Sequence, residues 1–320
     1  MIIKLTKWLL LIISFKIIVA LVVAHYYTDP RRDIRARKQY CHAFAPNVVF
    51  IGTSRTLYGI DPAVFDSANL QKTRSYNFGT FSLSPYSSMR LADELLAENT
   101  AISTIYIELS ALDYSTVALP PQQVIPDAIF RANVLANCPG TEFLDNAASF
   151  LAGLNTTLFQ MVSIAPQILS VKKLLNPGND PIEGQVDLVA NGYQSVAASL
   201  SATNDRLAAN QDATRQLLRT PRQAAPNTYF ISRINQLIAR AASQGRKVVF
   251  YYPNNITGGE YRILSQVAPF LPAENLIPLP EPPLLDSLFN PRNLFDAHHL
   301  NRQGAGIYTR FLREKSGRQE

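Results

Sequence analysis

The sequence predicts an α/β fold with a parallel β-sheet covered by helices on both faces. Short apolar strands alternate with amphipathic helices in residues 46–115 and again in residues 226–320, as in a parallel sheet with helical crossovers. Apolar residues make up 47% of the chain and charged residues 17%, which is typical of a globular body with a sizeable core. The 320 residues have room for one large domain or two ordinary ones.

An apolar N-terminal segment predicts a membrane helix in front of this body. From Trp8 to Tyr27 about twenty residues are mostly apolar, the length of a helix that crosses a bilayer. Lys16 in the middle is costly unless it snorkels to the membrane surface or finds a partner, such as another helix in the membrane. A cleaved signal peptide, with Val22 and Ala24 at the cleavage site, is the alternative. The length of the apolar run favours an uncleaved anchor over residues 1–28, followed by a linker over residues 29–45.

The positive charge of the chain belongs to this N-terminal arm. Residues 1–38 hold eight Lys or Arg and two Asp, which leaves 22 basic and 22 acidic residues for the rest. The body therefore shows no basic signal for nucleic-acid binding. More Lys and Arg follow the apolar segment than precede it, and this charge rule by itself predicts a cytoplasmic body.

The first half of the α/β body contains three expected strands and one helix. Residues 48–51 form the first strand, which stops at Gly52, and residues 73–79 form the second. Ser84 and Pro85 then begin a helix. Residues 103–110 form the third strand.

The second half repeats the alternation. Residues 226–245 predict an amphipathic helix that Gly245 ends. Residues 247–253 form a fourth strand, and residues 261–271 a helix. Residues 275–280 are a weak last strand, and residues 301–315 the final helix.

Residues 116–225 lack a clear strand and predict a mostly helical insertion. Residues 176–185 are expected to be a loop, and residues 188–219 to be helical. Such an insertion serves as a lid, as a docking surface for a partner, or as a solvent-facing decoration.

Two cysteines, Cys41 and Cys138, are the only ones in the chain. Neither lies in a CxxC motif or near a histidine cluster, so no metal site is expected. In an oxidising compartment they are a candidate disulfide; the alternative is two separate free thiols.

Three residues suggest nucleophilic chemistry. Ser54 follows the first strand, and open α/β sheets carry reactive groups at the carboxyl ends of their strands. Asp296 and His299 lie three residues apart before the last helix. A serine needs a base, and the base needs an orienting carboxylate, so the Asp-x-x-His loop can supply both. His298 is a second possible base.

The stretches FIGTSRTLYGIDP and DAHHLNRQGAGIYTRFL together resemble the first and last blocks of the SGNH (GDSL-like) hydrolase superfamily. The likeness is strongest to membrane-anchored bacterial members associated with polysaccharide acylation, and it omits the insertion. It implies a flavodoxin-like three-layer α/β/α sandwich, with Ser54 as nucleophile, His299 as base and Asp296 as the orienting acid. It also implies an oxyanion hole formed by the N–H groups of Ser54 and Gly79.

Two departures separate the chain from that family. The usual Gly-Asp-Ser is Gly-Thr-Ser here, and no Asn follows the third strand, in IELSALDY. Asn77 is the remaining candidate for the missing oxyanion donor, whose loss costs roughly a hundredfold or more in rate.

The resemblance implies an extracytoplasmic serine esterase or O-acyltransferase in the inner membrane, with its body in the periplasm. Its substrates would be acyl esters of a cell-envelope polysaccharide, and its partner a multispanning membrane acyltransferase. No cofactor is expected. The alternative function is a non-catalytic scaffold within such a membrane complex.

Overall fold

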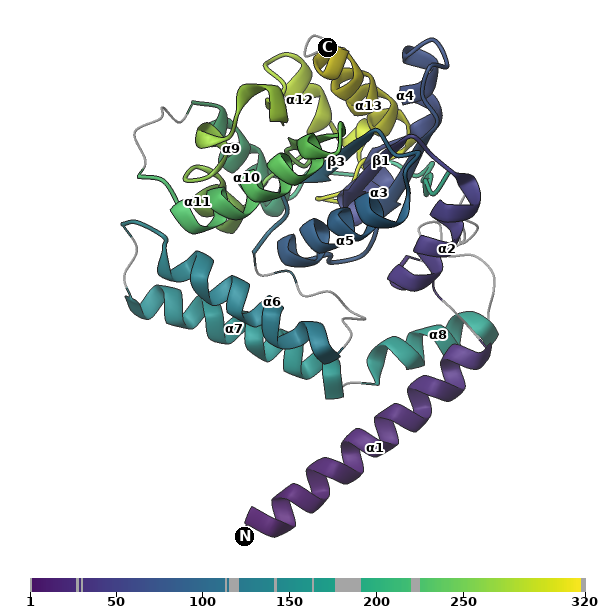
Figure 1. The fold of residues 1–320 in the computed structure, drawn as a ribbon, viewed down its shortest axis with the longest axis vertical. Coiled ribbons are helices and arrows are strands. Elements are labelled where there is room, and N and C mark those ends of the chain that lie inside the picture. Colours follow the sequence, from purple (N-terminus) through teal and green to yellow (C-terminus); the bar gives the residue numbers. More distant parts are fainter. Residues whose placement is uncertain are drawn as a thin grey trace.

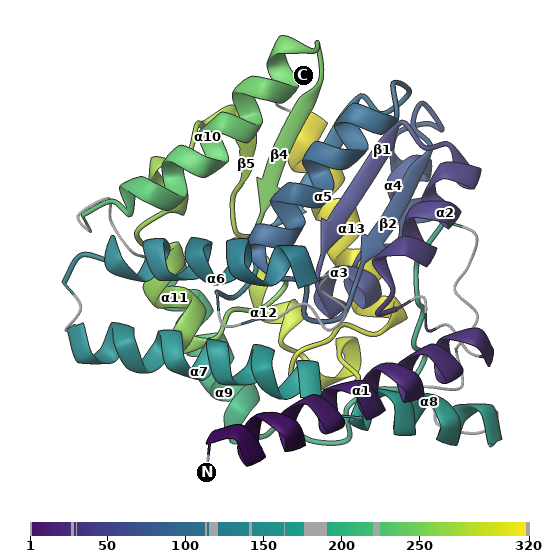
Figure 2. The same cartoon turned by 60° about the horizontal axis from the view of Figure 1, so that its bottom comes forward.

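The computed structural model describes residues 2–26, 29, 31–112, 114, 121–140, 143–162, 164–175, 191–219 and 225–317. Within these residues a five-stranded parallel sheet forms the centre of the body (Figures 1 and 2). The strand order is β2-β1-β3-β4-β5. The strands are β1 (Val48–Gly52), β2 (Ser75–Gly79), β3 (Thr104–Glu108), β4 (Lys247–Tyr251) and β5 (Leu276–Ile277). All five coincide with strands predicted from the sequence.

The strands are apolar on both sides because helices cover both faces of the sheet. Val49 and Ile51 of β1 belong to one buried cluster, which α5 and α10 complete. Val48 and Phe50 point the other way into a second cluster with α13. Side chains alternate between the faces along a strand, so the apolar run of β1 contributes to both cores. The predicted covering of both faces is confirmed.

Helices precede, connect and follow the strands. The helices of the body are α2 (Ile34–Phe44), α3 (Ser54–Gly59), α4 (Pro62–Ala68), α5 (Pro85–Glu98), α10 (Thr228–Ser243), α11 (Gly258–Leu264), α12 (Leu284–Leu288) and α13 (Arg302–Gly317), with 3-10 turns at Ala268–Phe270, Ala273–Asn275 and Pro291–Asn293. Helix α5 begins as expected, because the Ser84 side chain accepts from the Ser87 N–H and Pro85 occupies the first turn.

The insertion is helical at both ends but not throughout. It contains α6 (Pro121–Ala136), α7 (Phe143–Val162), α8 (Ala165–Leu175) and α9 (Asp205–Arg219). Residues 191–204, expected to be helical, are instead an irregular segment without helix or strand. Their backbone bonds to the body, with Gln194 N–H donating to Leu57 O at 3.2 Å and Leu200 N–H to Leu294 O at 2.7 Å. Tertiary hydrogen bonds thus override local helix propensity. The loop expected at 176–185 lies outside the described residues.

The N-terminal helix α1 (Ile2–Tyr26) projects from the body (Figure 1). Among the described residues it is the one helix long and apolar enough to cross a membrane, over Ile3–Val23. Length and composition fit a membrane anchor and a signal sequence alike.

Cys41 and Cys138 are separate buried thiols, so the candidate disulfide is not formed. Cys41 lies on α2, which packs beside the edge strand β2. The Cys138 thiol donates instead to Oε1 of Gln266 at 3.1 Å. Gln266 follows β4 in the chain. The body between these two places keeps the thiols apart, and a bridge needs Cα atoms within about 7 Å.

Candidate active site

Ser54 lies where β1 passes into α3. Thr53 caps α3, its hydroxyl accepting from the Arg55 N–H, so Ser54 is the first helical residue. Gly52 makes this tight junction possible, because a Cβ there would lie 2.5 Å from the Glu108 carboxylate and 1.9 Å from the Thr56 hydroxyl. Ser54 is thereby held at the carboxyl edge of the sheet, half-exposed.

The segment with Asp296 and His299 is a closed loop before α13. A bridge between Leu294 and Leu300 ties its ends. Inside the loop, Asp296 Oδ1 accepts from the N–H groups of His298 at 2.7 Å and His299 at 2.8 Å. Asp296 thus fixes the backbone of the base as well as its side chain.

The Leu-Asn-x-x-Gly stretch after this loop has a structural role. Asn301 Oδ1 accepts from the N–H groups of Gln303 and Gly304, both at 3.1 Å, which satisfies the first turn of α13. A Cβ on Gly304 would lie 2.2 Å from the Asn293 carbonyl oxygen, so the helix approaches that loop closely only with glycine.

The structure brings the three predicted catalytic residues together. His299 Nε2 lies 2.8 Å from Ser54 Oγ. His299 Nδ1 lies 2.8 Å from Asp296 Oδ2 and 3.0 Å from Oδ1. A serine hydroxyl, an imidazole and a carboxylate in this sequence can remove the serine proton and stabilise the resulting imidazolium.

Aromatic side chains hold the imidazole of His299. Phe295 stacks on it with ring centres 5.4 Å apart and planes within 10°. Tyr58 meets its edge at 5.3 Å. Val196, in the irregular segment 191–204, packs with Tyr58 and Phe295 in one small buried cluster. The insertion therefore packs against the two aromatic side chains that hold the His299 ring. This role was not predicted from the sequence.

Asp296 is held in its charged form. Burial alone would raise the pKa of Asp296, but hydrogen bonds from the His299 ring and from the N–H groups of His298 and His299 lower it below its ordinary value. An ionised carboxylate is the form that orients an imidazole base.

His298 does not take the place of the base. Its Nδ1 lies 3.2 Å from Asn210 Nδ2 of α9 and 3.5 Å from Asn255 Oδ1. Burial, with a smaller effect of the Arg206 charge, lowers the pKa of His298 to about 4. It is thus a neutral link between the loop, the insertion and the segment after β4.

The oxyanion donors expected from β2 are engaged elsewhere. The side chain of Asn77 is buried and donates to the carbonyl oxygens of Thr56 at 2.7 Å and Ile60 at 2.6 Å. Its Oδ1 accepts from the Gly79 N–H at 2.8 Å. A Cβ on Gly79 would lie 2.2 Å from Leu57 N, so this glycine serves the packing of α3 on β2. The expectation that Asn77 and Gly79 face the substrate is wrong.

Ser54 and Glu108 lie at the carboxyl ends of the neighbouring strands β1 and β3. The Ser54 N–H, at the start of α3, donates to no acceptor among the described residues. It is the expected donor that stays available. Glu108, at the end of β3, accepts from the Thr53 N–H at 2.9 Å and points into the body.

A buried ionic cluster, defined as Arg55, Glu108 and Glu260, lies beneath Ser54. Arg55 Nη2 is 2.9 Å from Glu108 Oε1 and 2.6 Å from Glu260 Oε1, and all three side chains are at most 1% exposed. The two carboxylates hold the pKa of Arg55 above its usual value despite burial. Sequence reasoning missed this cluster, although Arg55 directly after Ser54 and a charge ending the buried strand β3 were available signals.

The chain that follows α1 lies beside the site. Arg31 is buried, and its carbonyl oxygen accepts from the Phe81 N–H at 2.9 Å in the loop after β2. The guanidinium of Arg32 lies 5.2 Å from the Phe81 ring centre. Phe81 in turn contacts Tyr58, the neighbour of His299, at 6.0 Å between ring centres. The residues that follow α1 thus enter the body next to the triad.

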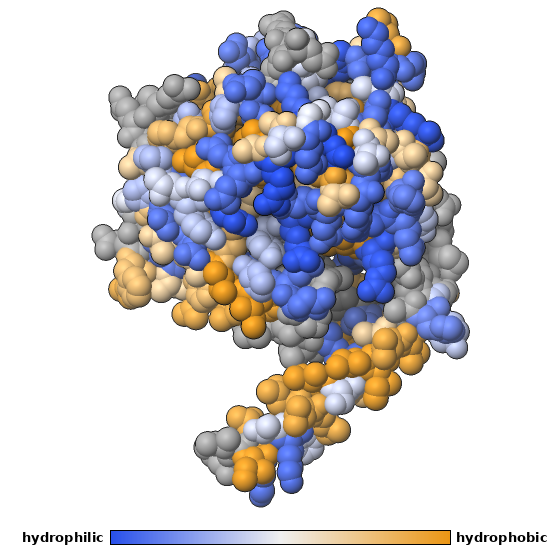
Figure 3. Space-filling view, in the orientation of Figure 1, coloured by the Kyte–Doolittle hydropathy of each residue, from blue (hydrophilic) through white to orange (hydrophobic). Residues whose placement is uncertain are grey.

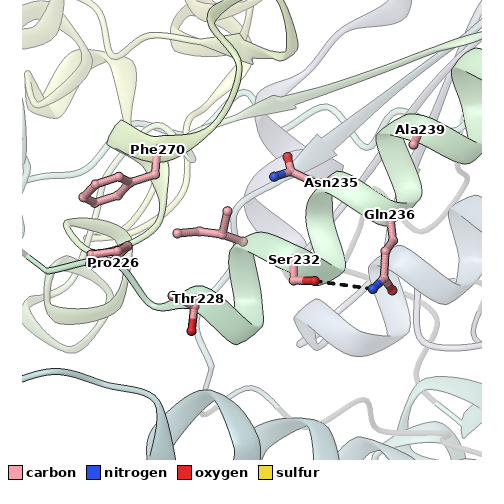
Figure 4. A pocket seen from close by; sticks show the side chains of 8 residues that line it. Pro226, Thr228, Ser232, Asn235, Gln236, Ala239 and Phe270 are labelled. Atoms are coloured by element: carbon pink, nitrogen blue, oxygen red, sulfur yellow. Dashed lines mark hydrogen bonds between the residues drawn. The ribbon is translucent and has the colours of Figure 1, made fainter.

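A pronounced surface hollow lies elsewhere. It has a volume of about 620 Å³ and is lined by α10 residues including Ser232, Asn235 and Gln236, with Phe270 at its rim (Figure 4). It shares no residue with the triad and has no charged lining. The hollow is therefore separate from the triad.

No described residues form a group of three or more His, Cys, Asp and Glu side chains that could hold a metal ion. Comparisons of the chain with protein-family models, with curated proteins and with solved structures found no match.

Proposed function

We propose that this protein is a membrane-anchored serine esterase or O-acyltransferase of the SGNH type. The observation that carries the proposal is the triad, in which His299 Nε2 lies 2.8 Å from Ser54 Oγ and its Nδ1 lies 2.8 Å from Asp296. Residues 54 and 299 are 245 positions apart, so a chance approach with correct donor and acceptor order is a poor explanation.

The triad assigns each residue one step. Ser54 Oγ attacks the carbonyl carbon of an acyl ester while His299 Nε2 takes its proton. The Ser54 N–H stabilises the oxyanion. The ester bond breaks as His299 returns the proton to the leaving alcohol, which leaves an acyl-Ser54 intermediate. Water or a sugar hydroxyl then attacks the acyl carbon while His299 takes its proton. The bond between the acyl group and Ser54 Oγ breaks as His299 returns the proton to Oγ, which releases the acyl group and restores Ser54.

The topology supports the family resemblance. The strand order β2-β1-β3-β4-β5 is that of a flavodoxin-like doubly wound sheet. With helices on both faces it agrees with a three-layer α/β/α sandwich. Ser54 follows the first strand and the Asp-x-x-His loop precedes the last helix, as the family pattern requires.

The anchor and its linker support a substrate at the membrane. Helix α1 fits a single span, and the residues after it contact Phe81 beside the site. We place the body in the periplasm, where an acyl ester of a cell-envelope polysaccharide would be the substrate. A multispanning membrane acyltransferase would be the partner that supplies or receives the acyl group.

One observation favours a second function, a non-catalytic scaffold in such a complex. Asn77 and the Gly79 N–H, two of the three expected oxyanion donors, are engaged within the fold. An incomplete oxyanion hole slows acyl transfer by a hundredfold or more for each donor lost.

A serine-directed fluorophosphonate probe separates the two functions. We expect the full-length protein to be labelled at Ser54 and the folded Ser54→Ala variant to stay unlabelled. Equal labelling of both, or none in either, would support the scaffold.

A reporter enzyme fused after Glu320 tests the location. We expect activity from a reporter that works only outside the cytoplasm. Activity from a reporter that works only in the cytoplasm would contradict both the periplasmic location and the proposed cell-envelope substrate.

A further inference from the structure

Exposed apolar side chains outside α1 are concentrated in the helical insertion. Among the described residues, every exposed large apolar side chain outside α1 belongs to α6, α7 or α8, except Tyr40 and Leu70. Phe143 and Leu144 at the start of α7 are 80% and 77% exposed, and Leu175 at the end of α8 is 72% exposed. Figure 3 shows these apolar residues over α6 and α7 and along α1. Clusters of this kind mark membrane or protein contacts.

The helices with this surface are those that contact the anchor. Helix α6 packs between the body and α7, and α1 packs against α7 and α8. Half-buried residues of α1 recur at Ile13, Lys16, Val19, Ala20 and Val23, which lie on one helical face. Lys16 therefore belongs to the face of α1 that is covered by protein. The apolar surface of the insertion is continuous with the helix that spans the membrane.

Three properties favour lipid over protein as the occupant of this surface. Residues 143–175 contain three charged side chains, Asp145, Lys172 and Lys173, although 17% of the whole chain is charged. Both lysines lie near the end of α8, where basic groups suit lipid phosphates. Among the described helices, α7 and α8 do not have the length and apolar composition needed to cross a membrane. They therefore suit the interface between headgroups and acyl chains.

We infer that α7 and α8, with the exposed side of α6, form a second membrane-binding element that lies in the phospholipid interface beside α1. The inference rests on the anchor of the proposed function but not on its serine chemistry. A second attachment limits the tilt of the body, and so it holds the Ser54 edge at a fixed orientation to the bilayer.

Site-specific fluorescence in the full-length protein tests the inference. Single cysteines replace Leu144 of α7, Leu169 of α8, Leu10 of α1 or Leu70 of the body, and each carries an environment-sensitive NBD dye. Cys41 and Cys138 are buried, so labelling of the folded protein is confined to the new thiol, with the unsubstituted chain as the blank. The variants are reconstituted in phosphatidylethanolamine–phosphatidylglycerol vesicles, with and without nitroxide-labelled lipid.

We expect nitroxide lipid to lower the emission at positions 10, 144 and 169 at least twofold and to leave position 70 unchanged. Leu70 is the matched control, because it is an exposed leucine outside the insertion. Quenching at 10 without quenching at 144 and 169 overturns the inference and leaves the anchor standing. An apolar emission shift at 144 and 169 without quenching also overturns it, since a protein surface then covers them. Quenching at 144 and 169 but not at 10 overturns the anchor of the proposed function, and with it the inference that these helices lie in the interface beside a membrane-spanning α1.

Discussion

At the scale of single residues, the triad forms one hydrogen-bonded unit. Ser54, His299 and Asp296 are linked by hydrogen bonds of 2.8 Å. Groups that act as one unit lose their effect together. We therefore expect Ser54→Ala and His299→Ala each to abolish most ester turnover, and the double variant to be little worse than either. Purified variants are compared in an ester-hydrolysis or acyl-transfer assay, with circular dichroism to confirm folding.

Two further variants are the controls for this prediction. Asp296→Asn should be severe, because it favours the wrong imidazole tautomer. His298→Ala should be mild, because its ring contacts Asn210 and Asn255 and not Ser54. Full turnover by a folded Ser54→Ala protein would exclude Ser54 as the nucleophile. Activity lost with His298→Ala but kept with His299→Ala would reverse the assignment of the base.

His298 should make the stability of the protein depend on pH. Its pKa is about 4 in the fold, because of burial, and about 6.5 in an unfolded chain. Between these values the unfolded state binds the proton more readily, so stability is complete above about pH 6.5 and falls as the pH drops toward 4. The difference in melting temperature between pH 7 and pH 5 should shrink in His298→Asn. An unchanged difference would mean that other groups carry the pH dependence.

Asn77 should contribute to folding and not to oxyanion binding. Its buried side chain bonds to Thr56, Ile60 and Gly79. Asn77→Ala leaves these groups unpaired and should lower the free energy of unfolding by on the order of 3 kcal/mol. Urea unfolding measures this loss. A variant of normal stability whose kcat falls by a factor of a hundred would identify Asn77 as an oxyanion donor after all.

At the scale of elements, the buried ionic cluster joins three segments under the nucleophile. Arg55 belongs to α3, Glu108 ends β3, and Glu260 belongs to α11. Arg55→Met leaves two buried carboxylates without their cation. We expect it to lower the free energy of unfolding by about 3–5 kcal/mol and to displace the start of α3.

An exposed ion pair provides the matched control for Arg55. Arg215 and Asp286 lie 2.8 Å apart with side chains 39% and 44% exposed. Because water screens such pairs, Arg215→Met should cost less than about 1 kcal/mol. An equal loss of unfolding free energy in the two variants would show that the buried ionic cluster contributes no more to stability than an exposed ion pair.

At the scale of the whole molecule, the arrangement of the body determines the state of the thiols. Cys41 packs at the β2 side and Cys138 bonds to Gln266. Burial raises the pKa of Cys41 to about 12 and also raises that of Cys138. We expect a thiol reagent to label neither residue in the native protein and both after denaturation without reductant. One disulfide per chain under those conditions would contradict the separation seen here.

The sequence by itself determined the local features of this protein. All five strands, the long helices between them and the apolar N-terminal helix follow from hydrophobic periodicity and from caps such as Ser84. Ser54, Asp296 and His299 could also be predicted from the sequence, because each lies in a short motif. These features depend on residues that are neighbours along the chain.

Only the tertiary structure decided which distant groups meet. It turned Asn77 and Gly79 inward, kept Cys41 from Cys138, left residues 191–204 without a helix, and placed Arg55 between Glu108 and Glu260. The physical reason is that a buried polar group must find a partner wherever the fold provides one. The identity of that partner depends on packing across the sheet and not on sequence distance.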